Sequence, residues 1–408
     1  CHADGGHYRH EWQNLDFASR AMLMVGITGT NGKTSISHWL AQAWTLLGRK
    51  TALIGTVGNG FVGELSDTTH TTPDPVTVQH RLADYLRQQA QVVAMEVSSH
   101  GLDQFRVNGV AFTTAVFTNL TRDHLDYHGD MDAYGASKAR LFHWDGLRHA
   151  VINIDDAFGQ TLAAGIDRQR TEVYTYGLTG GDITVTRLDA SLAGLHLDVR
   201  TPWGEGHIDT PLLGRFNAAN LLACLGALGA NGVALADACR VLGQILPARG
   251  RMQHSGGHRE PLVVIDYAHT PDALDKALAT LAEIRPAGGK LYCVFGCGGD
   301  RDPGKRPQMG AIAQARADVT VVTSDNPRSE APDAIIADIL AGMSAPGHVD
   351  PDRAAAIHWA IAQAQRGDVV LIAGKGHEEY QDIAGVKHPF SDFQVAEAAL
   401  ARWSPAHD

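Results

Sequence analysis

A repeated alternation of short apolar strands, glycine-containing loops and helices most constrains how this chain can fold. Residues 22–27 predict a buried strand, and residues 33–47 directly after it predict a helix. Further strands are expected at 92–96 and 113–118, and a further helix at 132–142. Repeated βα units need crossover helices, which cover the faces of a mostly parallel sheet. The pattern therefore predicts an α/β fold.

A segment of different character lies between about residues 171 and 209. Its stretch Leu195–Val199 alternates apolar and polar residues with a period of two, which is typical of a strand with one solvated face. We expect an antiparallel β insertion here. Two helices are expected after it, near 217–229 and 235–246.

The segment Pro247–Arg251 precedes a second α/β series. Its expected strands lie at 262–265, 291–295, 319–323 and 369–373, each before a loop that contains Gly or Pro. At roughly 150 residues per domain, 408 residues allow two or three domains. We therefore predict a remnant or linker over 1–20, a central domain over 21–247 and a C-terminal domain over 248–408.

Composition excludes several classes of protein. The formal net charge is 34 − 45 = −11, which argues against a generic binder of nucleic acids or anionic membranes. No apolar run reaches the ~18 residues that a membrane span needs. The five cysteines are odd in number and contain no CxxC pair, so a disulfide framework is not expected and a reducing cytoplasm fits.

The segment Gly26–Thr34 (GITGTNGKT) follows a predicted strand and opens a predicted helix. Glycines let several backbone N–H groups converge on phosphate oxygens, and the helix N-terminus favours anions. Lys33 can reach the β- and γ-phosphates, and the Thr34 hydroxyl can hold Mg²⁺. Position 27 is Ile where the strict P-loop pattern has Gly. The alternative is a glycine-rich turn without a ligand.

Three further side chains are candidates for a metal and phosphate site. Glu96 ends a predicted strand and offers carboxylate oxygens to Mg²⁺, although such an acid is often only a solvated loop residue. His124 is a second candidate ligand, with a structural histidine as the alternative. Lys138 lies on a predicted helix, where the residues alone favour a surface lysine.

Taken together, the motifs resemble those of the Mur ligase family of ATP-dependent amide-forming enzymes. They are Gly29–Thr34, Glu96–Leu102, Phe117–Gly129, Gly214–Asn220 and Asp266–Leu274. The segments Phe295–Arg301, Asp325–Arg328 and Gly374–Glu378 resemble the branch that adds diaminopimelate. The resemblance runs from about Leu23 to Asp392. It implies a P-loop-type, parallel-sheet ATP-binding domain with a β insertion, followed by a Rossmann-like C-terminal domain.

The resemblance also implies the chemistry. ATP would phosphorylate the D-glutamate γ-carboxylate of a UDP-muramoyl dipeptide, and an amine of meso-diaminopimelate would attack the acyl phosphate. Such phosphoryl transfer needs positioning and charge neutralisation rather than a protein nucleophile. ATP and Mg²⁺ are the implied cofactors. The expected enzyme is a cytoplasmic monomer that uses small-molecule substrates in peptidoglycan synthesis.

The residues that match the family's positions fall into four sets. Catalytic and metal positions are matched by Lys33, Thr34, Glu96, His124 and Lys138, the last as a carbamate. Nucleotide positions are matched by Gly29, Thr30, Asn31, Gly32, Lys33, Thr34, Asn217, Arg251, Asp266 and His269. Muramoyl-peptide positions are matched by His70, Thr71, Thr72, Ser98, Gln104 and Arg106. Diaminopimelate positions are matched by Arg301, Asp325, Asn326, Pro327, Arg328, Gly374 and Glu378.

Arg328 is the residue expected to select the amino acid. Diaminopimelate differs from lysine by a distal carboxylate, and a guanidinium binds carboxylate in a bidentate manner. The alternative is a structural loop arginine.

Other functions remain open at this point. Only about twenty residues precede the first strand, so we expect the uridine-gripping domain of full-length members to be missing. A nucleotide-binding remnant without turnover is therefore one alternative, and a folylpolyglutamate synthetase-like ligase is another. A Rossmann dehydrogenase is disfavoured, because Gly296–Gly299 does not spell GxGxxG.

Overall fold

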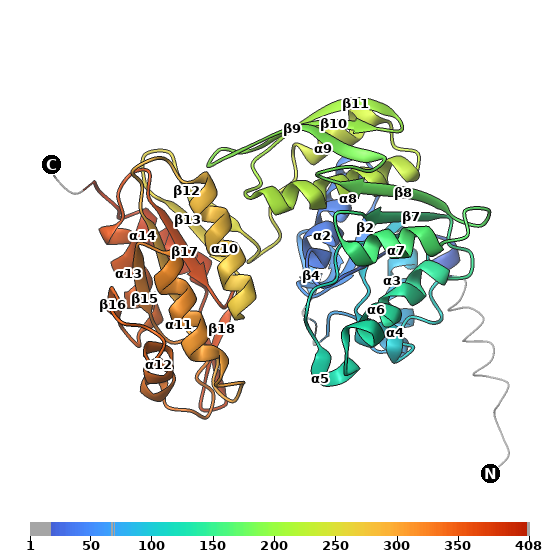
Figure 1. Cartoon of the computed structure of the whole chain (residues 1–408). Coiled ribbons are helices and arrows are strands. Elements are labelled where there is room, and N and C mark those ends of the chain that lie inside the picture. Colours follow the sequence, from blue (N-terminus) through green and yellow to red (C-terminus); the bar gives the residue numbers. More distant parts are fainter. Residues whose placement is uncertain (1–17, 67, 69, 406–408) are drawn as a thin grey trace, which may run out of the picture. The chain divides into compact units, whose positions relative to one another are not determined.

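The computed structural model describes residues 18–66, 68 and 70–405. Contacts divide the chain into two units (Figure 1). Unit 1 runs up to Asp189 and also contains Leu195–Pro211 and Arg215–Leu246, and unit 2 contains Ala190–Gly194, Leu212–Gly214 and the residues from Pro247 on. The predicted N-terminal remnant lies mostly outside the described residues.

Unit 1 is built on an eleven-stranded sheet whose order is β11-β10-β9-β8-β7-β6-β1-β5-β2-β3-β4. Its strands are β1 (Leu23–Thr28), β2 (Thr51–Gly55), β3 (Gly58–Phe61), β4 (Glu64–Ser66), β5 (Val92–Glu96), β6 (Thr114–Phe117), β7 (His149–Asn153), β8 (Glu172–Gly177), β9 (Ile183–Ser191), β10 (Gly194–Thr201) and β11 (Gly204–Thr210). Strands β2, β5, β1, β6, β7 and β8 are parallel. The carboxyl ends of β1, β5 and β2 therefore meet at one edge.

Helices cover both faces of this sheet. They are α2 (Lys33–Leu46), α3 (Pro75–Arg87), α4 (Ser99–Asp103), α5 (Leu125–His128), α6 (Met131–Ala139), η1 (Arg140–His143), α7 (Ala157–Gly165), α8 (Arg215–Ala230) and α9 (Leu235–Leu242). Helix α2 contacts β1, β2 and β5, and α8 contacts β6, β7 and β8. Val78, Leu82 and Tyr85 of α3 join a core cluster with Met24, Ile54 and Met95 of the strands.

The segment predicted as an antiparallel insertion departs from that prediction. Its first strand, β8, pairs parallel with β7, and β9 pairs parallel with β8 at Tyr176↔Ile183 and Gly177↔Thr184. Only β10 and β11 form the expected antiparallel hairpin, and all four strands extend the main sheet. The period-two pattern reports which face of a strand is solvated, but it does not report the direction or the partner of the strand.

Unit 2 contains a six-stranded sheet of order β12-β13-β17-β14-β15-β16 and a separate hairpin of β18 and β19. The strands are β12 (Gln253–Gly256), β13 (Leu262–Asp266), β14 (Leu291–Phe295), β15 (Val319–Val322), β16 (His348–Val349), β17 (Val369–Ala373), β18 (Tyr380–Ile383) and β19 (Val386–Pro389). The helices are α10 (Pro271–Ile284), α11 (Lys305–Arg316), α12 (Pro332–Leu340), α13 (Arg353–Gln363) and α14 (Asp392–Leu400). β13, β17, β14, β15 and β16 are parallel.

Alternate residues of these strands enter two different cores. Leu291, Cys293 and Phe295 of β14 pack with α10, α11 and α12, whereas Tyr292 and Val294 pack with α13 and α14. Because both faces of such a strand are buried, its sequence is a continuous run of apolar residues. The positions of these strands could therefore be predicted from the sequence. The α/β class predicted for both domains is confirmed. The predicted helices at 132–142 and 235–246 end earlier, at Ala139 and Leu242, and a 3₁₀ turn follows the first.

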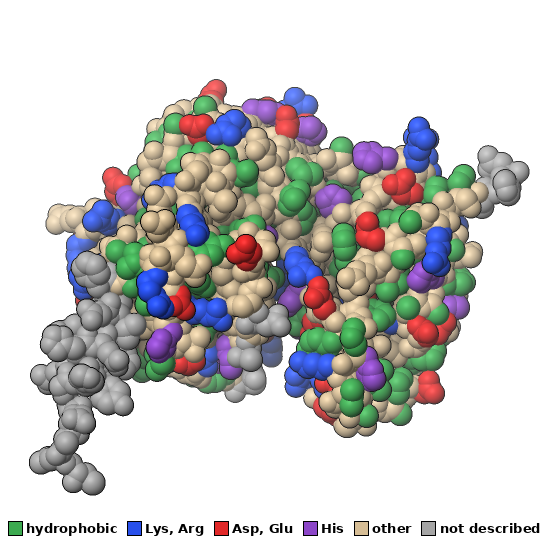
Figure 2. All heavy atoms as spheres, turned by 180° about the vertical axis from the view of Figure 1, so that it is seen from behind, with side chains coloured by type: hydrophobic (Ala, Val, Ile, Leu, Met, Phe, Trp, Pro, Cys, Tyr) green, Lys and Arg blue, Asp and Glu red, His purple; other side chains and the backbone are tan. Residues whose placement is uncertain are grey.

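The distribution of charged side chains on the surface is consistent with the acidic composition. Figure 2 shows Lys and Arg side chains interspersed with Asp and Glu on the face that it presents, rather than a single-sign basic surface of the kind nucleic acids bind. None of the helices in the described ranges combines the length and the apolar character that crossing a bilayer requires.

Candidate active site

The loop Gly29–Gly32 connects β1 to α2. Gly29 has φ +143° and Gly32 has φ +89°. Residues other than glycine rarely adopt such positive φ angles. A Cβ atom at Gly29 would lie 1.8 Å from Thr118 Oγ1, so no side chain fits there. The first N–H groups of a helix lack intrahelical acceptors and can serve an anion. The glycines therefore form a backbone cradle that suits a phosphate group.

A second loop, which follows β6, fixes this cradle. The Thr30 N–H donates to Asn119 O at 2.8 Å, and the Asn31 N–H donates to Asn119 Oδ1 at 2.9 Å. In return, Thr118 Oγ1 donates to Asn31 O at 2.6 Å. The sequence did not single out residues 118–119 as site residues. They lie here because β6 is the parallel neighbour of β1.

Thr34 and Glu96 meet at the carboxyl ends of neighbouring strands. Thr34 Oγ1 donates to Glu96 Oε2 at 3.0 Å, and both residues are buried. Thr56, which sequence reasoning missed, also holds this carboxylate, because its N–H donates to Oε1 at 2.8 Å and its hydroxyl donates to Oε2 at 3.1 Å. Its position directly after a strand was the available signal. A hydroxyl beside a carboxylate is an all-oxygen donor set that fits Mg²⁺.

Two lysine amines converge on one carbonyl of the phosphate loop. Lys33 Nζ donates to Gly29 O at 2.8 Å, and Lys138 Nζ donates to the same oxygen at 2.9 Å. Lys138 is only 1% exposed, and its amine lies 4.4 Å from the centroid of the Tyr134 ring. Burial, followed by the nearby Lys33 charge, lowers the pKa of Lys138 well below its usual value. Lys138 is thus not the surface lysine that the residues alone favoured.

His124 lies at the edge of this cluster. It has a left-handed backbone, with φ +53°, and its ring centroid lies 4.9 Å from that of His100 and 6.0 Å from that of Tyr134. Burial lowers the pKa of His124, Asp123 opposes that shift, and the charges of His100, Lys33 and Lys138 add to it. No hydrogen bond joins His124 to Thr34 or Glu96 within the described residues. His100 lies within the motif Glu96–Leu102 but was not among the residues predicted for the site.

Four of the six residues expected to hold a muramoyl peptide form one hydrogen-bonded group. Arg106 Nη1 donates to Thr72 O at 2.8 Å and its Nε donates to Gln104 Oε1 at 2.9 Å. The Ser98 N–H donates to Thr72 Oγ1 at 2.9 Å. Thr72 Oγ1 in turn donates to the Glu96 carbonyl at 2.9 Å, which links the group to the metal candidate. The other two lie nearby in sequence, with Thr71 Oγ1 3.0 Å from Thr56 Oγ1 and His70 exposed.

The nucleotide candidates are divided between the two units. Asn217 is buried on α8 of unit 1, where Asn220 Nδ2 donates to its Oδ1 at 3.0 Å. In unit 2, the Arg251 guanidinium lies 5.0 Å from the Tyr267 ring centroid, and His269 Nδ1 lies 2.7 Å from Tyr267 O.

Two polar side chains of the unit 2 group are the candidates for binding a ligand. Burial raises the pKa of Asp266, while Arg251 and the Met252 N–H oppose that shift. Arg251 Nε is buried and has no hydrogen-bond partner among the described residues. A buried donor without an acceptor is costly, so an anionic ligand would compensate for it.

The diaminopimelate candidates surround a lysine that sequence reasoning missed. Lys375 is fully buried, and its Nζ donates to Asn326 Oδ1 at 2.8 Å and lies 3.3 Å from Glu378 Oε2. Asn326 Nδ2 also donates to Glu378 Oε2, at 2.8 Å. Asp325 lies 3.5 Å from the same amine, and a Cβ at Gly374 would lie 3.1 Å from Asp325 Oδ2. The signal for Lys375 was its place in Gly-Lys-Gly, directly after a buried strand.

Arg328 lies beside this group in an isolated β-bridge with Ile383, and its backbone is left-handed. Its φ is +51°, its N–H donates to Asp382 O at 2.9 Å, and its Nη1 donates to Gly299 O at 2.6 Å. In the part of the chain that the structure describes, Nε and Nη2 donate to no protein acceptor. Arg301 lies close to Arg328. A Cβ atom at Gly298 would lie 2.9 Å from Arg328 Nη1 and 3.7 Å from Arg301 Cγ. Pro327 directly precedes Arg328. Its carbonyl oxygen packs so closely on Gly299 that a Cβ atom there would lie 1.9 Å from it.

A buried ion pair supports these loops. Arg353 and Asp392 are both fully buried and joined at 2.7 Å through Nε and Oδ1. The same guanidinium donates to Ser324 O at 3.2 Å and to Ala373 O at 3.0 Å. Arg353 therefore ties together the ends of the two strands that carry Asp325 and Gly374.

Comparison with known proteins identifies the family. The family model "Mur ligase middle domain" matches residues 27–228, and the family model "Mur ligase, glutamate ligase domain" matches residues 250–376. The chain belongs to the Mur ligase family. The resemblance inferred from the motifs is thereby confirmed.

Several named relatives of this Mur ligase are close to it. One from Chromobacterium violaceum is 69% identical over 98% of this chain and 85% of its own length. Relatives from Neisseria meningitidis serogroup A and Pseudomonas aeruginosa are 60% and 55% identical, over 92% and 95% of this chain and 77% and 80% of theirs. All three are named UDP-N-acetylmuramoyl-L-alanyl-D-glutamate–2,6-diaminopimelate ligase.

Solved structures support the fold of this Mur ligase. A structure of UDP-N-acetylmuramoyl-L-alanyl-D-glutamate–2,6-diaminopimelate ligase is 42% identical, with a TM-score of 0.73 over 96% of this chain and 81% of that one. Folylpolyglutamate synthase from Mycobacterium tuberculosis, complexed with ADP and AMPPCP, has a TM-score of 0.69 at 20% identity, over 89% of this chain and 90% of that one. At that identity, the second likeness establishes the fold alone.

Asp156 stabilises the loop after β6, which in this Mur ligase is hydrogen-bonded to the backbone of the glycine loop Gly29–Gly32. Its Oδ1 accepts from the Gly159 N–H as the N-cap of α7, and its Oδ2 accepts from the Leu120 N–H at 2.8 Å. Asp156→Ala should lower the free energy of unfolding by about 1–2 kcal/mol and raise KM for ATP. Urea unfolding and steady-state kinetics measure both effects. Asp352→Ala removes the N-cap of α13 and should leave KM unchanged; an equal KM effect in both variants would contradict the assignment.

Proposed function

We propose that this chain is an ATP-dependent amide ligase that joins meso-diaminopimelate to UDP-N-acetylmuramoyl-L-alanyl-D-glutamate in peptidoglycan precursor synthesis. The three relatives at 55–69% identity are named as ligases of UDP-N-acetylmuramoyl-L-alanyl-D-glutamate and 2,6-diaminopimelate. The observation that carries the proposal is the convergence of Lys33 and Lys138 on Gly29 O, in the glycine loop at the N-terminus of α2. The Lys33 ammonium and the cation held beside it would neutralise charge on a transferring phosphoryl group, so that no protein nucleophile is needed.

The cofactors proposed are ATP and Mg²⁺. When bound, they supply the phosphoryl group that activates the D-glutamate γ-carboxylate as an acyl phosphate, and the cation that offsets its charge. Thr34 and Glu96 would hold the cation, because together they offer a hydroxyl and a carboxylate already 3.0 Å apart. The backbone N–H groups where the loop enters α2 would bind phosphate oxygens, since those of Thr30 and Asn31 already donate to Asn119. Lys33 would turn from the loop carbonyls toward the same oxygens. Arg251, with its unpartnered buried Nε, would bind the nucleotide in unit 2.

Lys138 is proposed to act as a carbamate. The amine must be neutral to react with CO₂, and burial together with the Lys33 charge disfavours its ammonium form. Conversion to an anion would also add electrostatic attraction between Lys138 and the Lys33 ammonium. The carbamate and His124 would then complete the cation's surroundings.

The amino acid is proposed to enter the unit 2 group. Arg328 would pair with the distal carboxylate of diaminopimelate through Nε and Nη2, which have no protein acceptor among the described residues. Asp325, Asn326 and Glu378 would orient its ammonium groups, since they offer carboxylate and amide oxygens held by Lys375. The attacking amine then displaces phosphate from the acyl carbon.

The cellular setting is proposed to be the cytoplasm, with small molecules as substrates and a monomeric enzyme. The four cysteines at 224, 239, 293 and 297 are buried free thiols, which supports a reducing compartment. Burial raises the pKa of Cys224 and of Cys293, so neither is suited to act as a nucleophile.

The deciding experiment measures phosphate release from Mg-ATP by the 408-residue chain. It compares the muramoyl dipeptide with meso-diaminopimelate, the same dipeptide with L-lysine, and a reduced folate with L-glutamate. Release should require the dipeptide and be strong only with diaminopimelate. Release with the folate pair would favour a folylpolyglutamate synthetase activity. ATP binding without release under any condition would show a nucleotide-binding remnant instead of a ligase.

A further inference from the structure

Two histidines and two aspartates form a square on one face of the β10–β11 hairpin, and none of them belongs to the candidate active site. The register places His196 opposite Asp209 and Asp198 opposite His207. All four are polar positions of strands whose alternate residues, Leu195, Leu197 and Val199 among them, are buried. Because alternate residues of a strand share a face, the period-two pattern places all four side chains on the same face of the hairpin.

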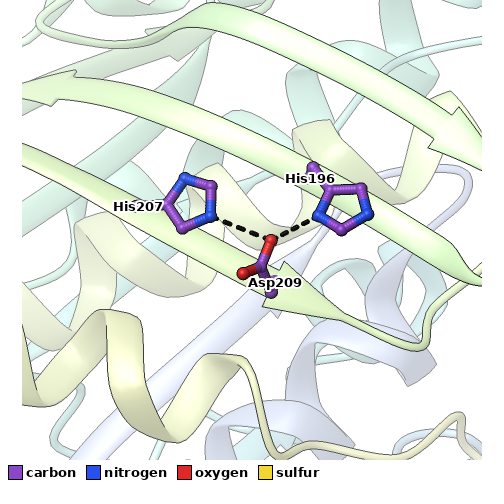
Figure 3. Close-up of side chains that lie close together, drawn as sticks. All are labelled: His196, His207 and Asp209. Atoms are coloured by element: carbon purple, nitrogen blue, oxygen red, sulfur yellow. Dashed lines mark hydrogen bonds and ion pairs between the residues drawn. The ribbon is translucent and has the colours of Figure 1, made fainter.

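Three of the four side chains point to one spot (Figure 3). Asp209 Oδ1 accepts a hydrogen bond from His196 Nδ1 and lies 2.9 Å from His207 Nε2. One ligand atom from each of the three residues lies within 4.8 Å of the other two. The side chains are 53%, 54% and 59% exposed for His196, His207 and Asp209, so water can complete a coordination sphere.

The fourth residue, Asp198, orients one of the rings. Its Oδ1 lies 2.7 Å from His207 Nδ1, so it accepts the proton on that nitrogen and leaves Nε2 to face Asp209. A carboxylate behind a histidine is the usual support of a metal-ligating imidazole, because it fixes the tautomer and raises the basicity of the ring.

The surroundings leave room for an ion and its waters. A cavity of about 300 Å³ is lined by His196, Asp198 and His207, with Arg187 and Asp189 of the neighbouring strand β9. Arg187 pairs with Asp189 at 2.7 Å, which offsets part of the repulsion between its charge and a cation.

We propose that His196, His207 and Asp209 bind a late first-row divalent cation of the zinc class, and that Asp198 positions His207. Two imidazoles and one carboxylate suit Zn²⁺, Ni²⁺ or Cu²⁺, whereas Mg²⁺ and Ca²⁺ prefer oxygen ligands alone. The cation takes the place of the protons that now join the rings to Asp209. Because its ligands come from both strands, it fastens β10 to β11 and stabilises the folded chain by mass action.

The test is a Zn²⁺ titration of the chelator-stripped full chain by calorimetry, with Mg²⁺ in excess to occupy all-oxygen sites. Wild type should bind one equivalent of Zn²⁺, and its melting temperature should rise with the Zn²⁺ concentration. His196→Gln and His207→Gln, on different strands, should each abolish this equivalent. Asp198→Asn should weaken the binding by about 10–100-fold. His80→Gln, on α3, replaces an exposed histidine outside the square and should bind as wild type does.

The outcomes separate this site from the ligase activity. Circular dichroism confirms that each variant is folded, and phosphate release without Zn²⁺ should be the same in all of them. Co²⁺ in place of Zn²⁺ gives an absorption spectrum that reports nitrogen ligation, and this spectrum should be lost in both histidine variants. Unchanged Zn²⁺ binding in His196→Gln and His207→Gln, or no binding by wild type, would overturn the proposal. Neither result depends on which acceptor the ligase uses.

Discussion

Lys138→Ala is expected to lower kcat by about 10²–10³-fold, as is typical when one preorganised electrostatic group is lost, because it removes the carbamate proposed to hold the cation beside the phosphoryl group. The side chain is buried and its amine shares Gly29 O with Lys33, so it acts where the phosphoryl group is proposed to lie. KM for ATP should change little, because the glycine cradle remains. Steady-state phosphate release measures both constants.

Lys138→Arg separates the two roles that this lysine could have. A guanidinium keeps the positive charge but does not form the carbamate, because it stays protonated. The arginine variant should therefore be as inactive as the alanine variant. Wild type supplied with ¹³C-bicarbonate should show a carbamate carbon signal that both variants lack. Recovery of activity in Lys138→Arg would show that the cation itself is required and would contradict the carbamate.

Arg328→Ala is expected to raise KM for diaminopimelate at least tenfold. A charge-assisted hydrogen bond contributes about 1.5–3 kcal/mol, which corresponds to roughly 10–100-fold in affinity. L-Lysine lacks the distal carboxylate, so the weak reaction with lysine should not become weaker still. The preference for diaminopimelate over lysine should therefore fall by the same factor. Competition between the two amino acids in one phosphate-release assay measures this ratio directly.

Two further variants control for charge and for structure. Arg328→Lys keeps the charge but loses the planar fork, so its KM should lie between those of wild type and Arg328→Ala. Arg316→Ala removes an arginine that pairs with Asp275 on the surface of unit 2, and its KM should equal that of wild type. An unchanged KM in Arg328→Ala would leave this arginine as a structural loop residue, held by Gly299 O.

Local features of the sequence were enough to predict much of the fold. Strands such as Leu291–Phe295 and Val369–Ala373 are continuous apolar runs, because helices cover both faces of their sheet. The glycines at 29 and 32 marked the phosphate loop, because few other residues adopt their backbone angles. The motif order was also sufficient for the family, which the comparisons confirm.

Other features depended on which strands become neighbours. Thr56 reaches Glu96 only because β2 pairs with β5, and the direction of β8 follows from its pairing with β7. The residues of a single strand do not specify which other strand it pairs with.

The sequence by itself thus determined the α/β class, the strand-ending residues and the family of this chain. The tertiary structure alone decided which of those residues meet. It buried Lys138 beside Lys33, placed Lys375 among the diaminopimelate candidates and brought His196 against Asp209. The physical reason is that residue patterns report burial and backbone angles, which are local, whereas a site forms from contacts between segments that are distant along the chain.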